Sequence, residues 1–582
     1  RCSSGLTLRQ RLTPSGQASL WWYHPVSFKD CEGEPTFQSI IAVMTIRAVA
    51  EQCGVSKLIL VGAPREVAAV LRSGFSVKEI GTHQSHGLWW LVLRGLVGRV
   101  LYAAQTLRIC AGCRRWTSRP RCLSQIAFSG FWDWSVSWND QTGSLSDRYF
   151  KSLPDELRRA GILSIGWLVW LDHHSDPSKQ RRRLKDVLAP LKNSKGVTIL
   201  QGFLYLRDIL RAVGDFGPLA TFLSVRKESS FRELFQANGI DYASLFTQPL
   251  LCGFLNWSLP YNELVALATE RAASQVRPQA FLSFLEHFPY ARAQYEGLRR
   301  AGLGTINIAV QHASYCREKT FYALHESLEF HGEPDGCAVP HPDYISTMGS
   351  LGLGLFLECG YPKDRVLLTG SPRYDHVRSG KTDAPSEKEI NFSSPKRTHD
   401  GEGGQKPTKD GTRLLMVCGL DVDLEMDMVE AVCTAAGSLE GLKIFLRSHP
   451  FRQIEKHPRF RPYASQIELL HGLLLDAILD ADLILFTYST VADEAYVMGK
   501  PVWQWLPLGF NGSALAEIAK IPQFASVASL RQALQQFCFN PSDIAPEASA
   551  RQDAVEQLFY RTDGQSARRI ARAVSQFLGV QS

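Results

Sequence analysis

Long runs of lysine and arginine are absent from this sequence, although its formal net charge is +7 over 582 residues. Proteins that bind nucleic acid usually cluster their basic residues on one face or in a tail, so we expect no nucleic-acid partner. A hydrophobic content of 45% with 21% charged residues is typical of a globular protein. A chain of this length exceeds what one hydrophobic core can fill, and two or three domains are expected.

A recognisable secretory signal is also missing, and the 13 cysteines are scattered along the chain. An odd number of scattered cysteines favours reduced thiols in a cytosol over a disulfide framework. We therefore expect a cytoplasmic protein. The chain begins with Arg1 rather than Met, which leaves the native N-terminus open.

The common nucleotide-binding fingerprints do not occur. There is no Gly-x4-Gly-Lys-Ser/Thr run of the Walker type. Gly349, Gly352 and Gly354 do not form a dinucleotide motif, because Leu357 breaks the spacing and no strand is expected before them. These absences argue against ATP hydrolysis and hydride transfer. Any phosphate must be recognised by hydroxyls, histidine, arginine and helix ends.

Acidic residues are absent from 88–124, a stretch that contains Trp89, Trp90 and seven arginines. Arginine interrupts it too often for a transmembrane span, whereas a basic helix with tryptophans suits the surface of an anionic bilayer. A buried helix with an exposed basic end explains the same pattern equally well. The first interpretation predicts a peripheral protein on the inner membrane surface.

Apolar runs that end in polar residues recur along the chain. One run ends at Glu286, the next at His312, and a third leads to Arg373. This pattern predicts a largely parallel sheet, whose ligands gather at the carboxyl ends of its strands. The apolar content collapses from Ser379 to Gly411, and α/β alternation then restarts. We therefore predict an α/β protein with a first domain at 1–378, a flexible linker at 379–411 and a second α/β domain at 412–582.

The second domain contains the clearest candidate for a phosphate site. An apolar strand at 482–487 leads to Ser489 and Thr490, and a helix pattern follows with acids in its first turn. The N-terminus of a helix presents unpaired amides and partial positive charge to an anion. A second strand, 442–447, ends in Arg447, Ser448 and His449, which all contact anions readily. Plain helix capping by Thr490 and Asp493 is the alternative explanation.

Taken in order, these motifs resemble the C-terminal half of GT-B glycosyltransferases that build bacterial surface polysaccharide. The resemblance rests on 447–450, on the strand that ends at Ser489 and Thr490, on Glu494 and Ala495, and on 499–502. It is closest to enzymes that use CMP-activated acidic sugars, the sialyl- and Kdo-transferases. Shorter stretches of the first domain are similar to a surface carbohydrate biosynthesis family: Trp21-Trp22, 146–150, 285–287, 310–312 and 370–375.

The sequence also departs from these families at two places. Ala313 follows His312 where many capsule enzymes have glycine. The acidic motif that carries the base in sialyltransferases is not evident.

The resemblance implies a GT-B-like fold, with two Rossmann-type doubly wound domains facing a cleft. It makes residues 1–378 the acceptor-side domain and residues 412–582 the nucleotide-sugar-binding domain. It implies that His449, Ser489 and Thr490 hold the nucleotide phosphate and that Glu494 binds the ribose hydroxyls. Arg447 and Arg373 are added on chemical grounds, because a guanidinium neutralises a phosphate or a sugar carboxylate in bidentate fashion.

Transfer also needs an acid-base group near the acceptor hydroxyl. Glu286 is the first choice, and Asp133 and Asp147 are reserves. We expect His312 to stabilise the leaving phosphate or to bind the donor carboxylate. Histidine, arginine and helix dipoles suffice for nucleotide departure, so no metal or cofactor is required beyond the nucleotide-sugar substrate.

The resulting hypothesis is transfer of a Kdo- or sialate-like sugar from a CMP donor to a lipid-linked acceptor, either lipopolysaccharide O-antigen or capsule. Three alternatives stay open at this point. They are phosphotransfer from a CDP-polyol, 2-epimerisation of a UDP-sugar, and a non-catalytic glycan-binding or assembly role.

Overall fold

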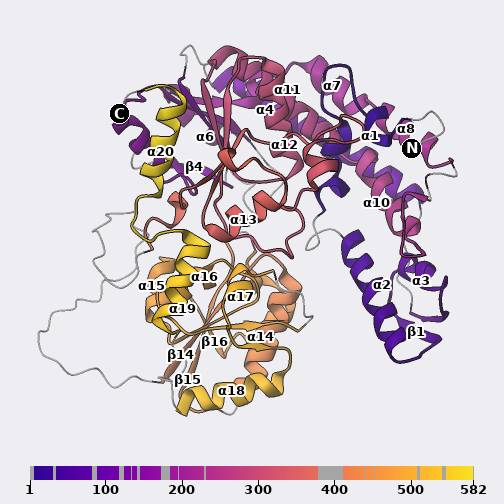
Figure 1. The fold of residues 1–582 in the computed structure, drawn as a ribbon, viewed down its shortest axis with the longest axis vertical. Coiled ribbons are helices and arrows are strands. Elements are labelled where there is room, and N and C mark those ends of the chain that lie inside the picture. Colours follow the sequence, from indigo (N-terminus) through magenta and orange to yellow (C-terminus); the bar gives the residue numbers. More distant parts are fainter. Residues whose placement is uncertain are drawn as a thin grey trace, which may run out of the picture.

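The chain forms two α/β domains in the computed structural model, one above the other in Figure 1. The structure describes residues 6–29, 35–81, 88–116, 124–132, 134–139, 144–171, 184–194, 196–228, 231, 233–377, 411–437, 439–450, 452–507, 512–539 and 546–580. In these ranges no helix is both long enough and apolar enough to cross a membrane.

The first domain is built on a seven-stranded parallel sheet in the order β13-β12-β11-β10-β3-β6-β7. Its strands are β3 (Ile126–Phe131), β6 (Ile165–Trp170), β7 (Val197–Ile199), β10 (Ala280–Phe284), β11 (Ile306–Val310), β12 (Tyr344–Thr347) and β13 (Val366–Leu368). The central strands β3 and β10 are buried at every position, as expected for a parallel sheet covered on both faces. The strand order reverses between β3 and β10, where the chain switches from one half of the sheet to the other.

The second domain repeats this plan with six strands in the order β16-β15-β14-β17-β18-β19. Its strands are β14 (Thr412–Val417), β15 (Leu442–Arg447), β16 (Ile467–Leu469), β17 (Leu483–Phe486), β18 (Val502–Trp505) and β19 (Gln523–Phe524). Counted within the domain, this is the Rossmann order 3-2-1-4-5-6, with the reversal between β14 and β17. The two sheets confirm the predicted α/β fold of two Rossmann-type doubly wound domains.

Helices cover both sheets. Those of the first domain are α1 (Leu8–Arg11), α4 (Leu88–Trp116), α5 (Leu153–Arg159), α6 (Leu184–Leu188), α7 (Leu206–Gly214), α8 (Gly217–Val225), α10 (Ala243–Leu255), α11 (Ser258–Val276), α12 (Pro289–Ala301) and α13 (Ser350–Glu358). The boundaries of α12 follow local chemistry: proline stands at its first position, and Gly302 ends it with a φ of 65°. Two short antiparallel pairs complete the domain: β4 (Val136–Asn139) with β5 (Ser144–Asp147), and β8 (Gln236–Ala237) with β9 (Ile240–Asp241).

The last helix of the chain returns to the first domain. The helices after the linker are α14 (Val422–Ala436), α15 (Leu474–Asp480), α16 (Val491–Val497), α17 (Ala514–Ile518), α18 (Val527–Phe539), α19 (Ala548–Ala554) and α20 (Ser566–Phe577). Ile570 and Val574 of α20 are buried in the same hydrophobic cluster as β3 and β10, and α20 lies beside the upper domain in Figure 1. Residues 566–577 therefore contribute to the first domain's core.

The N-terminal elements form a small unit of their own. It consists of α2 (Pro35–Gln52), β1 (Lys57–Val61), α3 (Arg65–Leu71) and β2 (Ser76–Ile80), at the lower right of Figure 1. β1 and β2 form a separate two-stranded parallel sheet. Val43, Leu60 and Val67 pack against Tyr242 and Leu245 near α10. The early α/β alternation therefore does not belong to the seven-stranded sheet.

The expectation that no strand precedes Gly349 is wrong, because β12 ends two residues before it and α13 follows. These glycines are explained by packing. A Cβ atom at Gly349 would lie 2.1 Å from the carbonyl oxygen of Gln557, and one at Gly352 would lie 2.6 Å from Oε1 of Gln311. The missing side chains allow the C-terminal segment and β11 to approach α13 closely.

Candidate functional site

The candidate residues lie at the carboxyl ends of the strands beside the two chain reversals. Glu286 comes two residues after β10, and His312 comes two residues after β11. In the second domain, His449 follows β15, and Ser489 and Thr490 follow β17. Ligands of open α/β sheets bind at these positions, outside the carboxyl ends of strands where the order reverses.

Glu286 and His312 form a buried pair. Oε1 of Glu286 lies 3.2 Å from Nε2 of His312, and both side chains are less than 10% exposed. The remaining polar atoms of the pair, Glu286 Oε2 and His312 Nδ1, are buried with no hydrogen-bond partner in the described part of the chain. Because buried polar atoms are nearly always paired in folded proteins, these two atoms are positions at which a ligand would complete the hydrogen bonding.

Aromatic rings and one arginine hold this pair in place. The rings of Tyr149 and Phe284 lie 4.4 Å and 5.6 Å from the imidazole of His312. Nη1 of Arg373 donates a hydrogen bond of 3.1 Å to the carbonyl oxygen of His312. The Arg373 guanidinium also lies over the rings of Tyr149 and Tyr374. Sequence reasoning missed Tyr149 as a site residue, although it belongs to one of the stretches that carried the resemblance.

His449 of the second domain lies within reach of positive charges from the first. Burial, with Arg373, Arg148 and Arg452 nearby, lowers the pKa of His449 to about 4. The imidazole is therefore neutral at pH 7, in a positive field that suits an anion. The charge of Arg373 acts on the imidazole of His449, so two residues predicted separately as phosphate ligands lie in the same electrostatic environment. Arg148 was not predicted, although it belongs to the same stretch as Tyr149.

The turn at Thr490 does not form the capping box considered above. Thr490 occupies the N-cap position of α16, but its side chain makes no capping hydrogen bond. The Asp493 carboxylate instead accepts a hydrogen bond from the hydroxyl of Ser314, which follows β11 in the first domain. Burial raises the pKa of Asp493 to about 7. This contact holds the start of α16 against the first domain, so the carboxyl edges of the two sheets face each other.

Glu494 also contacts the first domain. Its Oε2 atom lies 3.0 Å from Nε2 of His376, which comes just before the polar linker. The hydrogen bond to Glu494 raises the pKa of His376. Sequence reasoning placed Glu494 at the ribose but carried no signal for His376, because the two residues meet only through the packing of the domains.

A buried glutamate joins the loops at the reversal in the second domain. Oε1 of Glu425, in α14, accepts hydrogen bonds from the backbone N–H of Gly419, at 2.6 Å, and from the hydroxyl of Thr487. Burial raises the pKa of Glu425 to about 7. Nearby, the backbone N–H of Asp421 donates to the Tyr488 hydroxyl at 2.8 Å. Glu425 was not predicted, since an acid in the first turn of a helix is ordinary.

The other predicted residues have different contacts. Nη1 of Arg447 donates to the carbonyl oxygen of Leu470 at 3.3 Å, and the hydroxyl of Ser448 donates to Glu455. Both contacts stay within the second domain and do not reach the Glu286–His312 pair.

Asp147 and Asp133 are the alternative candidates for the acid-base group. Oδ1 of Asp147 accepts the backbone N–H groups of Tyr149 and Phe150, while burial raises its pKa to about 6. Asp147 thus positions the loop that carries Tyr149. Asp133 lies outside the described residues.

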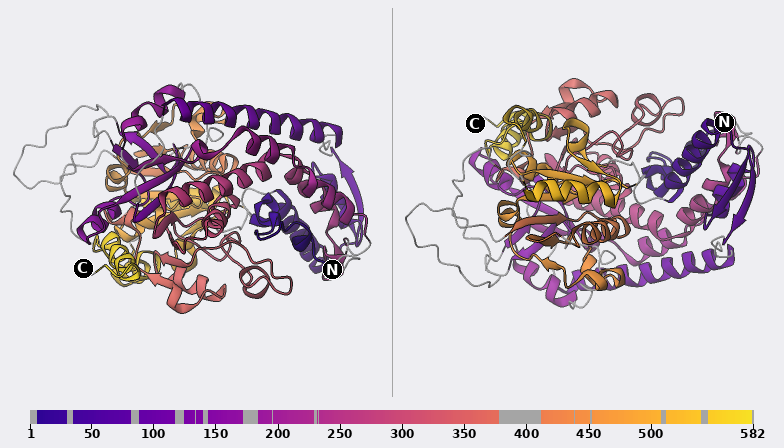
Figure 2. Two further views of the ribbon diagram at one scale, coloured as in Figure 1. Left: turned by 90° about the horizontal axis from the view of Figure 1, so that it is seen from above. Right: turned by 90° about the horizontal axis from the view of Figure 1, so that it is seen from below.

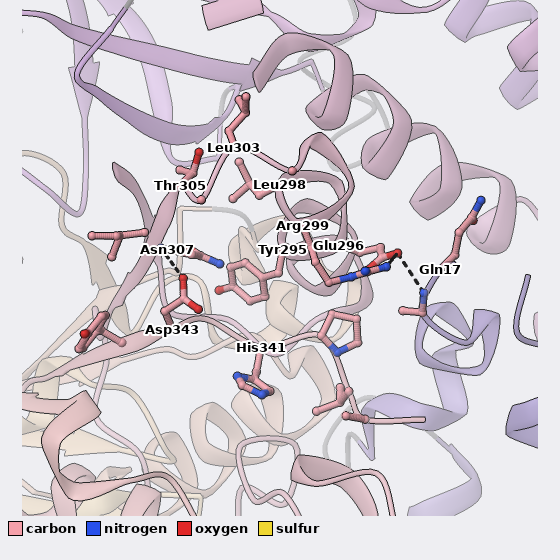
Figure 3. Close-up of a pocket in the computed structure, with 18 of the residues that line it drawn as sticks. Gln17, Tyr295, Glu296, Leu298, Arg299, Leu303, Thr305, Asn307, His341 and Asp343 are labelled. Carbon is pink, nitrogen blue, oxygen red and sulfur yellow. Dashed lines mark hydrogen bonds and ion pairs between the residues drawn. The ribbon is translucent and has the colours of Figure 1, made fainter. Parts of the chain in front are cut away.

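A cavity of about 830 Å³ lies elsewhere, at the amino ends of β11 and β12 (Figure 3). Tyr295, Asn307 and Asp343 point toward one another there, and the backbone N–H of Asn307 donates to Asp343 at 2.8 Å. Because the candidate residues lie at the opposite, carboxyl ends of these strands, this cavity is separate from the candidate site.

Comparison with known proteins gives a fold likeness only. No protein-family model and no curated protein matches the chain. Among solved structures it is similar to UDP-GlcNAc 2-epimerase from Neisseria meningitidis bound to UDP-GlcNAc, with a TM-score of 0.41 and 10% identity over 78% of this chain and all of that one. A glycosyltransferase of kitacinnamycin has a TM-score of 0.39 and 11% identity, over 79% of this chain and 100% of that one. The wall teichoic acid polymerase TagF has a TM-score of 0.40 and 9% identity, over 84% of this chain and 97% of that one.

Proposed function

We propose that this protein is a GT-B-type glycosyltransferase that moves an acidic, Kdo- or sialate-like sugar from a CMP-activated donor to a surface polysaccharide acceptor, lipopolysaccharide O-antigen or capsule. The observation that carries the proposal is Arg373, which donates a hydrogen bond to the carbonyl oxygen of His312 in the Glu286–His312 pair and whose charge also acts on His449 of the second domain. Transfer from an anionic donor calls for such positive charge near a buried carboxylate.

The positive side of the site suits the donor. A CMP-activated acidic sugar carries a phosphate and a carboxylate, and guanidinium groups bind both in bidentate fashion. In this proposal Arg373 and the neutral His449 hold the phosphate, together with the hydroxyls of Ser489 and Thr490. Arg148 adds to the positive field. Glu494 binds the ribose hydroxyls after His376 has moved away from it.

The buried pair supplies the acid-base chemistry. Glu286 Oε2 has no partner among the described residues, so it accepts the proton of the acceptor hydroxyl as that oxygen bonds to the anomeric carbon. The bond between the anomeric carbon and the phosphate oxygen breaks, and CMP leaves with the electron pair. Positive charge from Arg373 stabilises the leaving phosphate, with no metal or cofactor assigned. His312 holds Glu286 through its Nε2 atom.

Calorimetry with CMP, CDP-glycerol and UDP tests the proposal. The expected result is binding of CMP in preference to UDP. A clear preference for UDP would exclude the CMP donor and favour an epimerase, and a preference for CDP-glycerol would favour polyol phosphate transfer. If no nucleotide binds, the protein is a non-catalytic glycan-binding or assembly factor.

A further inference from the structure

The long helix α4 has two faces with opposite character. It runs along one edge of the molecule, as the long purple helix at the upper edge of the left view in Figure 2. Counted from Trp89 at about 100° per residue, seven large, exposed apolar side chains fall on one arc of about 140°. These residues are Trp89, Trp90, Leu93, Leu96, Val97, Val100 and Leu101, and they form what we call the outer face of α4. Their exposed fractions run from 38% for Leu96 to 84% for Trp89.

The inner face of α4 is fixed to the first domain. A Cβ atom at Gly95 would lie 3.1 Å from Cβ of Leu255 in α10, so the two helices are in close contact. The buried guanidinium of Arg99 donates to the carbonyl oxygens of Leu255, Val213 and Phe254 at 2.8–2.9 Å. These contacts prevent α4 from rotating to bury its outer face. The apolar stripe therefore remains available to a partner.

The charge around the outer face selects the kind of partner. Arg94 and Arg108 are exposed near the outer face, at about 140° and 100° around the helix axis from Trp89. Helix α4 contains no acidic residue. Two copies of this face would bring like charges together in a symmetric dimer. An anionic lipid surface instead complements the arginines, accepts the aliphatic side chains and accommodates a tryptophan at its interface.

We propose that the outer face of α4 is a membrane-docking surface that binds anionic bilayers. The helix lies in the interface with Trp89 and Val100 inserted, while Arg94 and Arg108 contact lipid phosphates. This surface deepens the proposed function, because a lipid-linked acceptor is presented at a membrane. Its geometry does not depend on which nucleotide the site binds.

Co-sedimentation of the full chain with vesicles tests this proposal. Vesicles of phosphatidylcholine with phosphatidylglycerol are compared with vesicles of phosphatidylcholine alone, without nucleotide. We expect binding to the anionic vesicles that weakens with salt. The variant Trp89→Glu/Val100→Glu should lower binding by about ten-fold or more. Arg94→Gln/Arg108→Gln should remove most of the salt dependence.

The matched control is Leu163→Glu/Phe539→Glu, which places the same two charges at apolar residues that are 78% and 91% exposed outside α4. This double variant should bind vesicles like the unmodified chain. The proposal is overturned if the unmodified chain ignores anionic vesicles, or if Trp89→Glu/Val100→Glu binds them unchanged. A dimer in light scattering that this double variant dissociates would assign the face to a second copy. Calorimetry of CMP without vesicles reports on the nucleotide site separately, so either idea can fail alone.

Discussion

His376 lies 3.0 Å from Glu494, and this contact joins the end of the first domain to α16 of the second. It occupies the carboxylate that the proposed function assigns to the ribose. If the proposed function is right, His376 competes with the ribose hydroxyls of the donor for this carboxylate.

Replacing His376 with Ala should strengthen CMP binding by about two- to five-fold. The reason is that an ion pair with one solvent-exposed partner, such as His376–Glu494, contributes at most about 1 kcal/mol. The pKa of His376 is raised by Glu494, so protonated His376 holds the carboxylate most firmly at acidic pH. CMP affinity of the unmodified chain should rise with pH as this proton is lost, and the variant should lack that rise. Calorimetry across pH measures both. Weaker binding by His376→Ala would show that His376 supports the nucleotide.

Replacing Glu286 with Gln should abolish transfer while CMP binding is retained. The amide keeps the size of the side chain and a contact to His312, but it cannot accept the acceptor proton. Loss of a general base lowers turnover by about 10²- to 10⁴-fold. The measurement is turnover with a CMP-sugar beside calorimetry of CMP. Undiminished turnover would move the acid-base role away from Glu286.

Replacing His449 with Ala should weaken CMP binding by about 1 to 3 kcal/mol, the cost of losing a hydrogen bond to a charged group. Because its pKa is lowered to about 4, His449 is neutral from pH 5 to 8, and the loss should be constant over that range. The control is His457→Ala, because His457 also precedes a proline in the same domain and its imidazole accepts the backbone N–H of Arg459. Equal affinity of the two variants would count against the phosphate site.

Glu425 should make the second domain less stable as pH rises. Its pKa increases from 4.5 in a free side chain to about 7 in the fold, mainly through burial. Between these values the folded state keeps a proton that the unfolded state has released, so the free energy of unfolding falls from about pH 4.5 to 7 and then levels off.

Replacing Glu425 with Gln keeps the acceptor oxygen for Gly419 and Thr487 and removes the ionisation. Urea unfolding should show that this variant loses the decline and is more stable at pH 8, by an amount on the order of 3 kcal/mol. The exposed Glu468→Gln serves as a control that should leave the pH profile unchanged. A profile for Glu425→Gln that matches the unmodified chain would contradict this prediction.

Local pattern was sufficient to predict much of the fold. The apolar run that ends before Thr487 forms β17, and the run that ends at Arg447 forms β15. The recurrence of apolar runs that end in polar residues predicted parallel sheets, whose ligands gather at the carboxyl ends of the strands. The strand before Gly349 was missed, since β12 has only four residues and its Ser346 and Thr347 are polar yet fully buried.

The sequence by itself determined the strand-end residues that can contact an anion, Arg373, His449 and Ser489 among them, and the acid-free composition of α4. Only the tertiary structure decided which of them meet. Glu286 reaches His312, and Glu494 reaches His376 across 118 positions of the chain. It also decided that Arg99 is buried while Trp89 is exposed. Such pairings depend on how the two sheets and their helices pack. That packing is set by contacts between residues far apart in the sequence, and a local sequence pattern does not contain them.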